Sequence, residues 1–203
     1  MSSSKATTYK SKEILITGFG GQGIVLSGQI LGKAASLIDD RQSTLTQSYG
    51  PEARGGACSA QVIISEESIH YPYVEHPDIL VCMSQGGFDK YGAKVKESGM
   101  LIIDQDLVQP SEVKCAESFS VPATRIAEEL GRRMMANIVM MGFLTAVTGA
   151  VSVEAARQMV LQSVPKGSEE ANTAAFNKGY DFGLATLKGR QKKAEAGKKG
   201  ARG

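Results

Sequence analysis

The 203-residue sequence has no tryptophan, only three cysteines, and no apolar run near the roughly 20 residues that a membrane-spanning helix needs. The cysteines, Cys58, Cys82 and Cys115, lie far apart, form no CxxC pair and are accompanied by only two histidines. This spacing argues against a disulfide framework and against a zinc or iron–sulfur site in this chain. We therefore expect no metal ligands here and interpret each cysteine as a small buried hydrophobe.

The amino-terminal residues lack an apolar stretch. Residues 1–12 contain serine, threonine and lysine, so we expect neither a signal peptide nor an anchor, and we expect a cytoplasmic protein without membrane contact. The composition, with 42% hydrophobic and 22% charged residues, is that of an ordinary globular protein. We predict a disordered extension at 1–12 and one domain at 13–187.

Positive charge is concentrated at the carboxyl end. The net charge is +2, but residues 188–203 hold seven lysines and arginines against Glu195 alone, so the rest of the chain is acidic. Because this segment is rich in glycine and alanine and has no aromatic residue, we predict a disordered basic tail at 188–203. We expect no nucleic-acid partner.

Short apolar runs alternate with helical patterns along the chain, which is typical of an α/β fold. Continuous runs such as 79–83 and 100–103 favour parallel strands that are covered on both faces. We predict a single three-layer domain with a mostly parallel sheet and a Rossmann-like glycine turn after the first strand. The predicted strands are 14–17, 43–47, 57–65, 79–83 and 100–103, and the predicted helices are 22–38, 88–98, 123–149, 152–163 and 169–187.

The long helical stretch at 123–149 is charged at its start and apolar from residue 134 onward. Four methionines, Met134, Met135, Met140 and Met141, lie in the apolar half. Flexible unbranched side chains on a buried helix usually fill gaps in a core or contact another subunit. We predict the same role for these four residues.

The first predicted strand leads directly into a glycine-rich turn. Gly18, Gly20 and Gly23 match the pattern G-x-G-x-x-G, in which backbone amides at a helix start face a phosphate. A dinucleotide site also needs an acidic residue about 20 residues further on, but the next strand ends in Thr46-Gln47-Ser48. This disfavours a nicotinamide cofactor and leaves either an anion site or a purely structural turn.

A second glycine-rich segment, at 48–56, reads Ser-Tyr-Gly-Pro-Glu-Ala-Arg-Gly-Gly. Gly50-Pro51 favours a tight turn, and Gly55 lets the backbone approach a ligand or another chain. Glu52 and Arg54 have two interpretations. They form an exposed ion pair of little energetic value, or Arg54 faces a phosphate or carboxylate, which its forked guanidinium suits.

No catalytic set can be recognised in the sequence. His70 and His76 lie close together, but no serine or cysteine nucleophile pattern accompanies them. Each precedes or adjoins a proline-containing step, and residues before proline favour an extended backbone. We predict a structural loop before the strand at 79–83.

Taken together, the two glycine-rich segments resemble the gamma subunit of 2-oxoacid:ferredoxin oxidoreductases. The resemblance covers about residues 13–187, and the second segment is similar to the 2-oxoglutarate or branched-chain 2-oxoacid branch rather than to the pyruvate or indolepyruvate branch. It continues through 62–65, Pro77-Asp78, 99–104, 137–144 and 172–179.

This resemblance implies one subunit of a heteromeric enzyme. Such an enzyme decarboxylates a 2-oxoacid, with 2-oxoglutarate as our first choice, on thiamine diphosphate, passes two electrons singly through iron–sulfur clusters to ferredoxin, and delivers the acyl group to coenzyme A. The resemblance places thiamine diphosphate and the clusters in partner subunits, named alpha and beta, with a ferredoxin-like delta subunit as a further candidate. We expect the isolated chain to be inactive and to hold no tightly bound cofactor, and a homodimer of the isolated chain remains open.

We interpret the two segments as loops at a subunit interface that help to receive coenzyme A, and we assign no catalytic residue to this chain. Two alternatives remain: an assembly or binding subunit of the same complex without a catalytic role, and a stand-alone nucleotide-binding oxidoreductase. The predicted ligand-binding residues are Gly20, Gly21, Gln22, Gly23, Ser48, Tyr49, Gly50, Glu52, Arg54 and Gly55.

Overall fold

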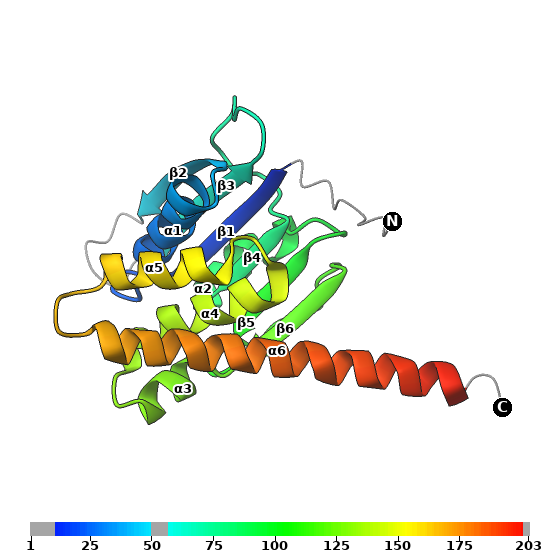
Figure 1. The fold of residues 1–203 in the computed structure, drawn as a ribbon. Coiled ribbons are helices and arrows are strands. Elements are labelled where there is room, and N and C mark those ends of the chain that lie inside the picture. The colour runs from blue at the N-terminus through cyan, green and yellow to red at the C-terminus, as the bar shows by residue number, and fades with distance from the viewer. Residues whose placement is uncertain (1–10, 50–56, 201–203) are drawn as a thin grey trace, which may run out of the picture.

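The computed structural model describes residues 11–49 and 57–200, in which six strands form one sheet of order β2-β3-β1-β4-β5-β6 (Figure 1). The strands β1, β4, β5 and β6 run parallel, and β2 and β3 add an antiparallel edge. The mostly parallel sheet is as predicted. The strands are β1 (Ser11–Phe19), β2 (Gln42–Tyr49), β3 (Ala57–Ser65), β4 (Ile79–Cys82), β5 (Met100–Asp104) and β6 (Glu117–Val121).

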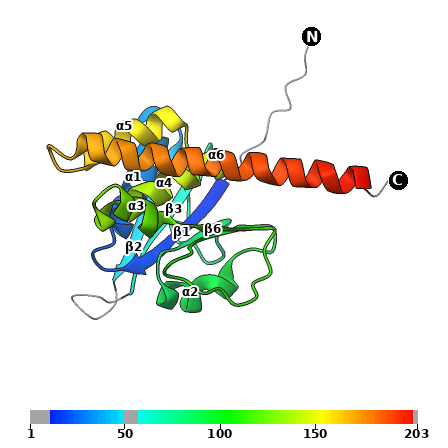
Figure 2. The same cartoon turned by 90° about the horizontal axis from the view of Figure 1, so that it is seen from below.

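Helices cover both faces of this sheet and make three layers. The larger core lies between one face and the helices α1, α4, α5 and α6, whereas α2 and irregular segments cover the other face, where Leu15, Leu80 and Phe88 are buried (Figure 2). The predicted three-layer α/β domain is therefore confirmed. The helices are α1 (Ile24–Lys33), α2 (Gln85–Tyr91), α3 (Ala123–Glu129), α4 (Ala136–Thr148), α5 (Val153–Ser163) and α6 (Glu169–Gly200), and a π-helical turn (Ala34–Ile38) extends α1.

The edge strand β6 has no counterpart among the predicted strands. Its sequence is mostly polar, and only Phe119 and Val121 are buried. A strand at the sheet edge packs only part of its surface, so its sequence carries no continuous apolar run. The three inner strands with long apolar runs, β1, β4 and β5, were all predicted at the correct places.

The helix predicted over 123–149 is two helices. Gly131, with a φ of 85°, ends α3, and the amides of Gly131 and Arg132 bond to the last carbonyls of that helix. Glycine just past a helix end is a common stop signal because it adopts the left-handed conformation without strain. A short 3-10 turn, η3 (Arg133–Met135), then leads into α4. This break places Met134 at the surface, where it is 82% exposed, so of the two predicted roles only contact with another subunit still applies to it.

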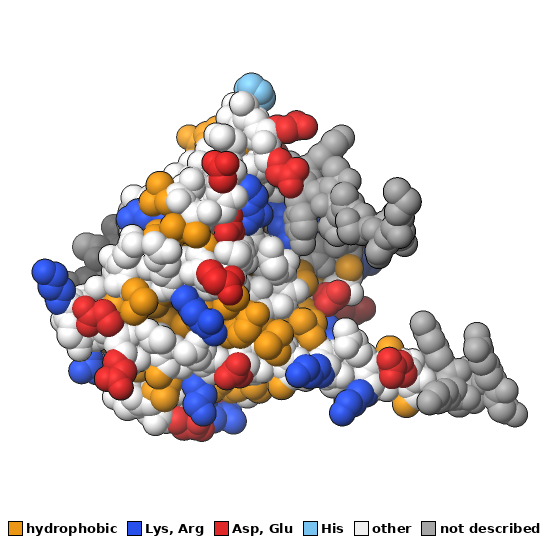
Figure 3. All heavy atoms as spheres, in the orientation of Figure 1, with side chains coloured by type: hydrophobic (Ala, Val, Ile, Leu, Met, Phe, Trp, Pro, Cys, Tyr) orange, Lys and Arg blue, Asp and Glu red, His pale blue; other side chains and the backbone are white. Residues whose placement is uncertain are grey.

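Helix α6 continues to Gly200 instead of ending at residue 187, so the prediction of disorder is wrong for 188–200. Lysine, alanine, arginine and glutamine favour helix without any packing. Arg190 also anchors this part, because its guanidinium lies 3.7 Å from the centre of the Phe119 ring and donates to the carbonyl of Ser118. Figure 3 shows basic side chains on the part of α6 that extends from the domain.

Within the described residues, no helix is both long and apolar enough to cross a membrane.

Two helices of the larger core, α4 and α6, cross at very short distance. Residues 136–145 of α4 are all buried. A Cβ atom on Gly179 of α6 would overlap the carbonyl oxygen of Val139, and one on Gly142 of α4 would overlap that of Phe176. Glycine at both places lets the two backbones touch, which fixes the start of α4 relative to the sheet.

Candidate functional site

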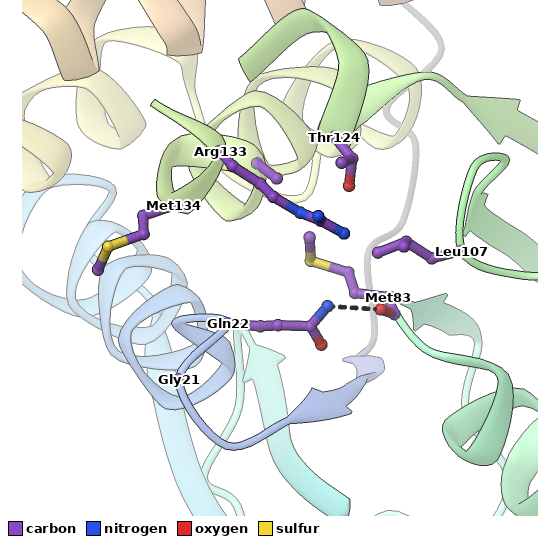
Figure 4. Close-up of a pocket in the computed structure, with 8 residues that line it drawn as sticks. Gly21, Gln22, Met83, Leu107, Thr124, Arg133 and Met134 are labelled. Carbon is purple, nitrogen blue, oxygen red and sulfur yellow. Dashed lines mark hydrogen bonds between the residues drawn. The ribbon is translucent and has the colours of Figure 1, made fainter. Parts of the chain in front are cut away.

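The glycine-rich turn joins the end of β1 to the start of α1, and Gln22 holds it in shape. The backbone amide of Phe19 donates to Gln22 Oε1 at 2.6 Å, and Gln22 Nε2 donates to the carbonyl of Met83 at 2.8 Å (Figure 4). The side chain of Gln22 therefore ties the ends of β1 and β4 together. Both ends of its amide are used within the protein.

Asn137, near the start of α4, fixes the last glycine of the turn. Gly23 has a φ of 73°, and Asn137 Nδ2 donates to its carbonyl at 3.3 Å. A Cβ atom at Gly23 would overlap this amide group. Asn137 is 3% exposed, so the contact is buried, and it sets the start of α1 against the start of α4.

A groove of about 630 Å³ opens beside this contact. It lies between the starts of α1, α4 and α6, since Gly23, Asn137 and Asn172 all line it. Helix starts carry partial positive charge on free backbone amides, and neither α1 nor α4 has an acidic residue in its first turn. The positive ends of these two helices are therefore not compensated locally.

Three cationic side chains add to this positive field. Arg132 and Arg133 enter from the turn before α4, and Lys166 enters from the segment between α5 and α6. Among the described residues that line the groove there is no carboxylate. Helix starts combined with arginine and lysine form a binding site for phosphate or carboxylate groups.

A smaller cavity of about 200 Å³ adjoins the groove, because Gly21, Arg133 and Met134 line both spaces. Met83, Leu107 and Ala136 supply most of its apolar wall, and Thr124 and Gln22 supply polar groups (Figure 4). The Thr124 hydroxyl donates to Asp104 Oδ2 at 2.6 Å. Since Gln22 is also bonded within the protein, the wall offers few free polar groups besides the guanidinium of Arg133.

Asp104, at the end of β5, is fully buried, and burial raises its pKa above the ordinary value. Hydrogen bonds from the amide and hydroxyl of Thr124 and from the amide of Asp106 oppose that rise. The two donors of Thr124 fix the start of α3, and the amide of Asp106 fixes the turn after β5. Asp104 has the surroundings of a structural carboxyl group rather than of an acid–base catalyst.

The first predicted segment is only partly at the site. Gly21 and Gly23 line the groove, and Gly21 and Gln22 line the smaller cavity. Gly20 lies in the exposed part of the turn and is not among the described lining residues of either cavity. The amide of Gln22 shapes the turn, and its contact with a ligand stays a prediction.

The second predicted segment begins at the same edge of the sheet as the first. Ser48 of β2 and Thr17 of β1 are both paired with Ser59 of β3, so β1 and β2 end at the same level. Ser48 is exposed and lines neither cavity. Tyr49 is the last residue of β2, and its side chain, together with Gly50, Glu52, Arg54 and Gly55, lies outside the described residues.

The loop that contains His70 and His76 lies at the opposite edge of the sheet. It connects the end of β3 to the start of β4, and β3 runs antiparallel to β1. Both histidines are therefore remote from the glycine turn, and the irregular connection predicted before β4 is confirmed.

The cysteines are separate thiols. Burial raises the pKa of Cys82 to about 12 and also raises the pKa of Cys58, so both remain protonated and unreactive. Cys115 is half-buried, which differs from the expectation, and donates to the carbonyl of Glu117. Within 11–49 and 57–200, no group of three or more His, Cys, Asp or Glu side chains is placed to hold a metal ion, so these residues do not fit an iron–sulfur cluster.

Four residues of the groove were absent from the predicted set: Arg132, Arg133, Lys166 and Asn137. The two arginines follow Gly131, and because the sequence pattern predicts a continuous helix there, it does not predict that they are exposed at a helix break. Lys166 lies between Pro165 and Gly167, a pattern that breaks a helix and exposes the residue between. The pattern predicts a helix break, but nothing in the sequence predicts that this break lies beside the glycine turn.

Similarity to known proteins covers most of the chain. It is 51% identical over 173 residues to 2-oxoglutarate synthase subunit KorC of Methanocaldococcus jannaschii, which covers 84% of this chain and 92% of the relative. The gamma subunit of keto/oxoacid ferredoxin oxidoreductase from Geobacter sulfurreducens superposes with a TM-score of 0.75 at 40% identity, over 86% of this chain and 99% of that one.

A more distant structure shares the fold. The 2-oxoglutarate:ferredoxin oxidoreductase of Magnetococcus marinus superposes with a TM-score of 0.79 at 20% identity, over 87% of this chain and 31% of that chain. The family model described as pyruvate ferredoxin/flavodoxin oxidoreductase matches residues 13–182. With this match and the 51% identical relative, the chain belongs to the pyruvate ferredoxin/flavodoxin oxidoreductase family.

Proposed function

We propose that this chain is the gamma-type subunit of a 2-oxoglutarate:ferredoxin oxidoreductase and that its cationic groove receives coenzyme A. The complex converts 2-oxoglutarate, coenzyme A and oxidised ferredoxin to succinyl-coenzyme A, carbon dioxide and reduced ferredoxin. The choice of 2-oxoglutarate rests on the 51% identity to KorC along nearly the whole of both chains. The choice of ligand rests on the groove itself.

Coenzyme A carries a diphosphate and a further phosphate on its ribose, so it presents several negative charges within a short length. Arg132, Arg133 and Lys166 face the groove from two separate segments. The starts of α1 and α4 lie beside them, since Gly23 and Asn137 line the same groove. Such a set of spaced donors suits several phosphates better than a single anion. This is the observation that carries the proposal.

In this proposal the chain binds and orients coenzyme A, and the bond-making steps take place elsewhere. Thiamine diphosphate and iron–sulfur clusters belong to alpha, beta and delta-type partner subunits, with ferredoxin as the electron acceptor. The glycine-rich segment at 48–56 remains a predicted contact with a partner subunit or with the ligand. Glu52 and Arg54, outside the described residues, remain predicted contacts.

Calorimetric titration of the full chain with coenzyme A tests the groove. Exchanging Arg132→Glu together with Lys166→Glu places two negative charges in the groove, so we expect coenzyme A to bind at least about tenfold more weakly. Lys178→Glu is the matched control, because this exposed residue of α6 does not line the groove.

Equal affinities of the double variant and the unchanged chain would refute the groove as the coenzyme A site. The absence of binding by the unchanged chain would favour the assembly role. A parallel titration with NAD tests the alternative of a stand-alone nucleotide-binding oxidoreductase. In that case NAD would bind more tightly than coenzyme A.

A further inference from the structure

The two edges of the sheet differ in how well they are protected against the addition of a further strand. Strand β6, at one edge, has only five residues and contains Glu117, and its Ser118 carbonyl accepts a hydrogen bond from the Arg190 guanidinium. Short length, charge and a covering segment are the means by which proteins protect an edge, because free amides and carbonyls there can pair with another chain. The β6 edge is therefore poorly suited to accept a strand.

Strand β2, at the other edge, lacks these features within the described residues. Its eight residues, Gln-Ser-Thr-Leu-Thr-Gln-Ser-Tyr, include neither a charged residue nor a proline. They pair one to one with β3 from Gln42 to Tyr49, so no bulge interrupts the strand. Figure 1 shows β2 at the margin of the sheet, and β3 is its only paired neighbour among the described strands. No described strand uses the outward-facing amides and carbonyls of β2, which form a template for pairing.

Apolar side chains lie beside the start of β2. The π-helical turn at Ala34–Ile38 packs against this strand. Two of its side chains, Leu37 and Ile38, are 66% and 37% exposed. A second domain that extends the sheet also extends the layer of helices on each face, so it can cover apolar surface next to the edge. Such burial would add to the hydrogen bonds of the strand pair.

The sequence of β2 fits a second copy of the same strand. Leu45 lies between Thr44 and Thr46, and uncharged polar residues follow on both sides. When two copies of β2 run antiparallel about a two-fold axis at Leu45, Thr44 of each copy faces Thr46 of the other. Gln42 and Ser48 form the next pair on the same face. Threonine pairs stabilise antiparallel strands, no like charges meet in these pairs, and a two-fold axis is the commonest symmetry of protein dimers.

From these observations we infer that the β2 edge binds a second copy of this chain, with the two β2 strands paired antiparallel about Leu45. The two sheets then form one continuous sheet, and corresponding faces lie on the same side of it. This inference depends neither on the ligand nor on the substrate of the proposed function.

Sedimentation equilibrium of the full chain measures the dimer. We expect the unchanged chain to dimerise with a dissociation constant of about 10 µM or below. In Gln42→Lys with Ser48→Lys, each new lysine faces a lysine of the second copy, so the dissociation constant should rise at least about tenfold. Gln158→Lys with Gln162→Lys is the matched control, because it adds the same charge at exposed positions of α5. It should leave the dissociation constant unchanged.

A variant with opposite charges tests the pairing itself. In Gln42→Lys with Ser48→Glu, each lysine faces a glutamate of the second copy, so the dissociation constant should return to within about threefold of that of the unchanged chain. Positions 42 and 48 lie about 20 Å apart along one strand, so the new charges interact little within a single chain.

A monomeric unchanged chain would overturn the inference. A dimer that the two lysines do not weaken would place the contact elsewhere on the molecule, and a weakened dimer that the lysine–glutamate variant does not restore would refute the pairing about Leu45. Protection of β2 only in the complex with other subunits would assign this edge to a partner strand and would equally overturn the inference.

Hydrogen exchange of the unchanged chain locates the contact without any variant. Above the dissociation constant, amides of Gln42–Tyr49 should exchange more slowly than below it, because those that point outward gain carbonyl partners on the second copy. The other edge strand, Glu117–Val121, is the internal control and should exchange equally at both concentrations. Slower exchange at β6, or no change at β2, would contradict the inferred contact.

Discussion

Single side-chain amides give the glycine turn its shape. Gln22 links the ends of β1 and β4, and Asn137 links the turn to α4. Gly23 must remain glycine for two reasons, its positive φ and the Asn137 amide against it. Packing within the protein is therefore the first explanation of the glycine pattern. The same packing brings helix starts together, and these favour anion binding.

Whether a site residue could be predicted depends on how far it lies from the glycine turn in the sequence. Gly21 and Gly23 could be predicted because a strand, a turn and a helix are adjacent in the chain. Arg132 and Lys166 could not, because each lies about a hundred residues or more from the glycine turn, and their approach depends on how α4 and α6 cross. Glu52 and Arg54 remain predictions.

Lys12 gives a prediction for pH dependence. Burial, helped by the charge of Arg41, lowers its pKa from 10.5 to about 8, with Asp78 acting in the opposite direction. Between these two values the unfolded chain binds more protons than the folded chain, so stability rises with pH in this window. Below about pH 8 Lys12 is charged in both states, and the cost of burying that charge is fully present.

Urea unfolding of the unchanged chain and of Lys12→Met between pH 7 and pH 10 checks this. The difference in free energy of unfolding, unchanged chain minus variant, should increase from about pH 8 upward. Groups common to both chains cancel in this difference. A difference that stays constant or falls with pH would contradict the account of Lys12.

At the scale of elements, the crossing of α4 and α6 determines where the groove lies. It sets the start of α4, and with it Asn137 and η3, beside the glycine turn. The inner strands and most helices could be predicted because buried elements have strong periodic patterns. The strand β6, the helix break at Gly131 and the end of α6 could not, because they depend on edge position, on one left-handed glycine and on a contact with Phe119.

The close crossing predicts a strong effect at Gly179. In Gly179→Ala the new methyl group overlaps the Val139 carbonyl, so the helices must separate, and we expect a loss of about 3 kcal/mol in the free energy of unfolding. Gly189→Ala is the matched control on the same helix, because its Cβ would meet no neighbour. It should stabilise the protein by roughly 0.5–1 kcal/mol, since alanine favours helix over glycine.

Thermal or urea unfolding measures both variants. If Gly179→Ala were as stable as the unchanged chain, the two backbones could not lie as close as described. A large loss in Gly189→Ala would show that the effect of alanine does not come from the crossing.

At the scale of the whole molecule, the site lies where the connections of the sheet diverge. From β1 the chain passes through α1 to β2 on one side, and from β4 it passes through α2 to β5 on the other. Ligands of open α/β sheets usually bind at this point, outside the carboxyl ends of the strands. Here the glycine turn, η3 and the start of α4 surround that position.

The central proposal is that this chain serves 2-oxoglutarate oxidation as a subunit that receives coenzyme A. The most direct measurement is ferredoxin reduction, dependent on 2-oxoglutarate and coenzyme A, by the complex that copurifies with the tagged full chain. We predict that the complex reduces ferredoxin and forms succinyl-coenzyme A, and that Arg132→Glu with Lys166→Glu raises the KM for coenzyme A while the KM for 2-oxoglutarate stays unchanged. A complex that forms succinyl-coenzyme A at the same rate and with the same KM after this chain has been removed would contradict the account.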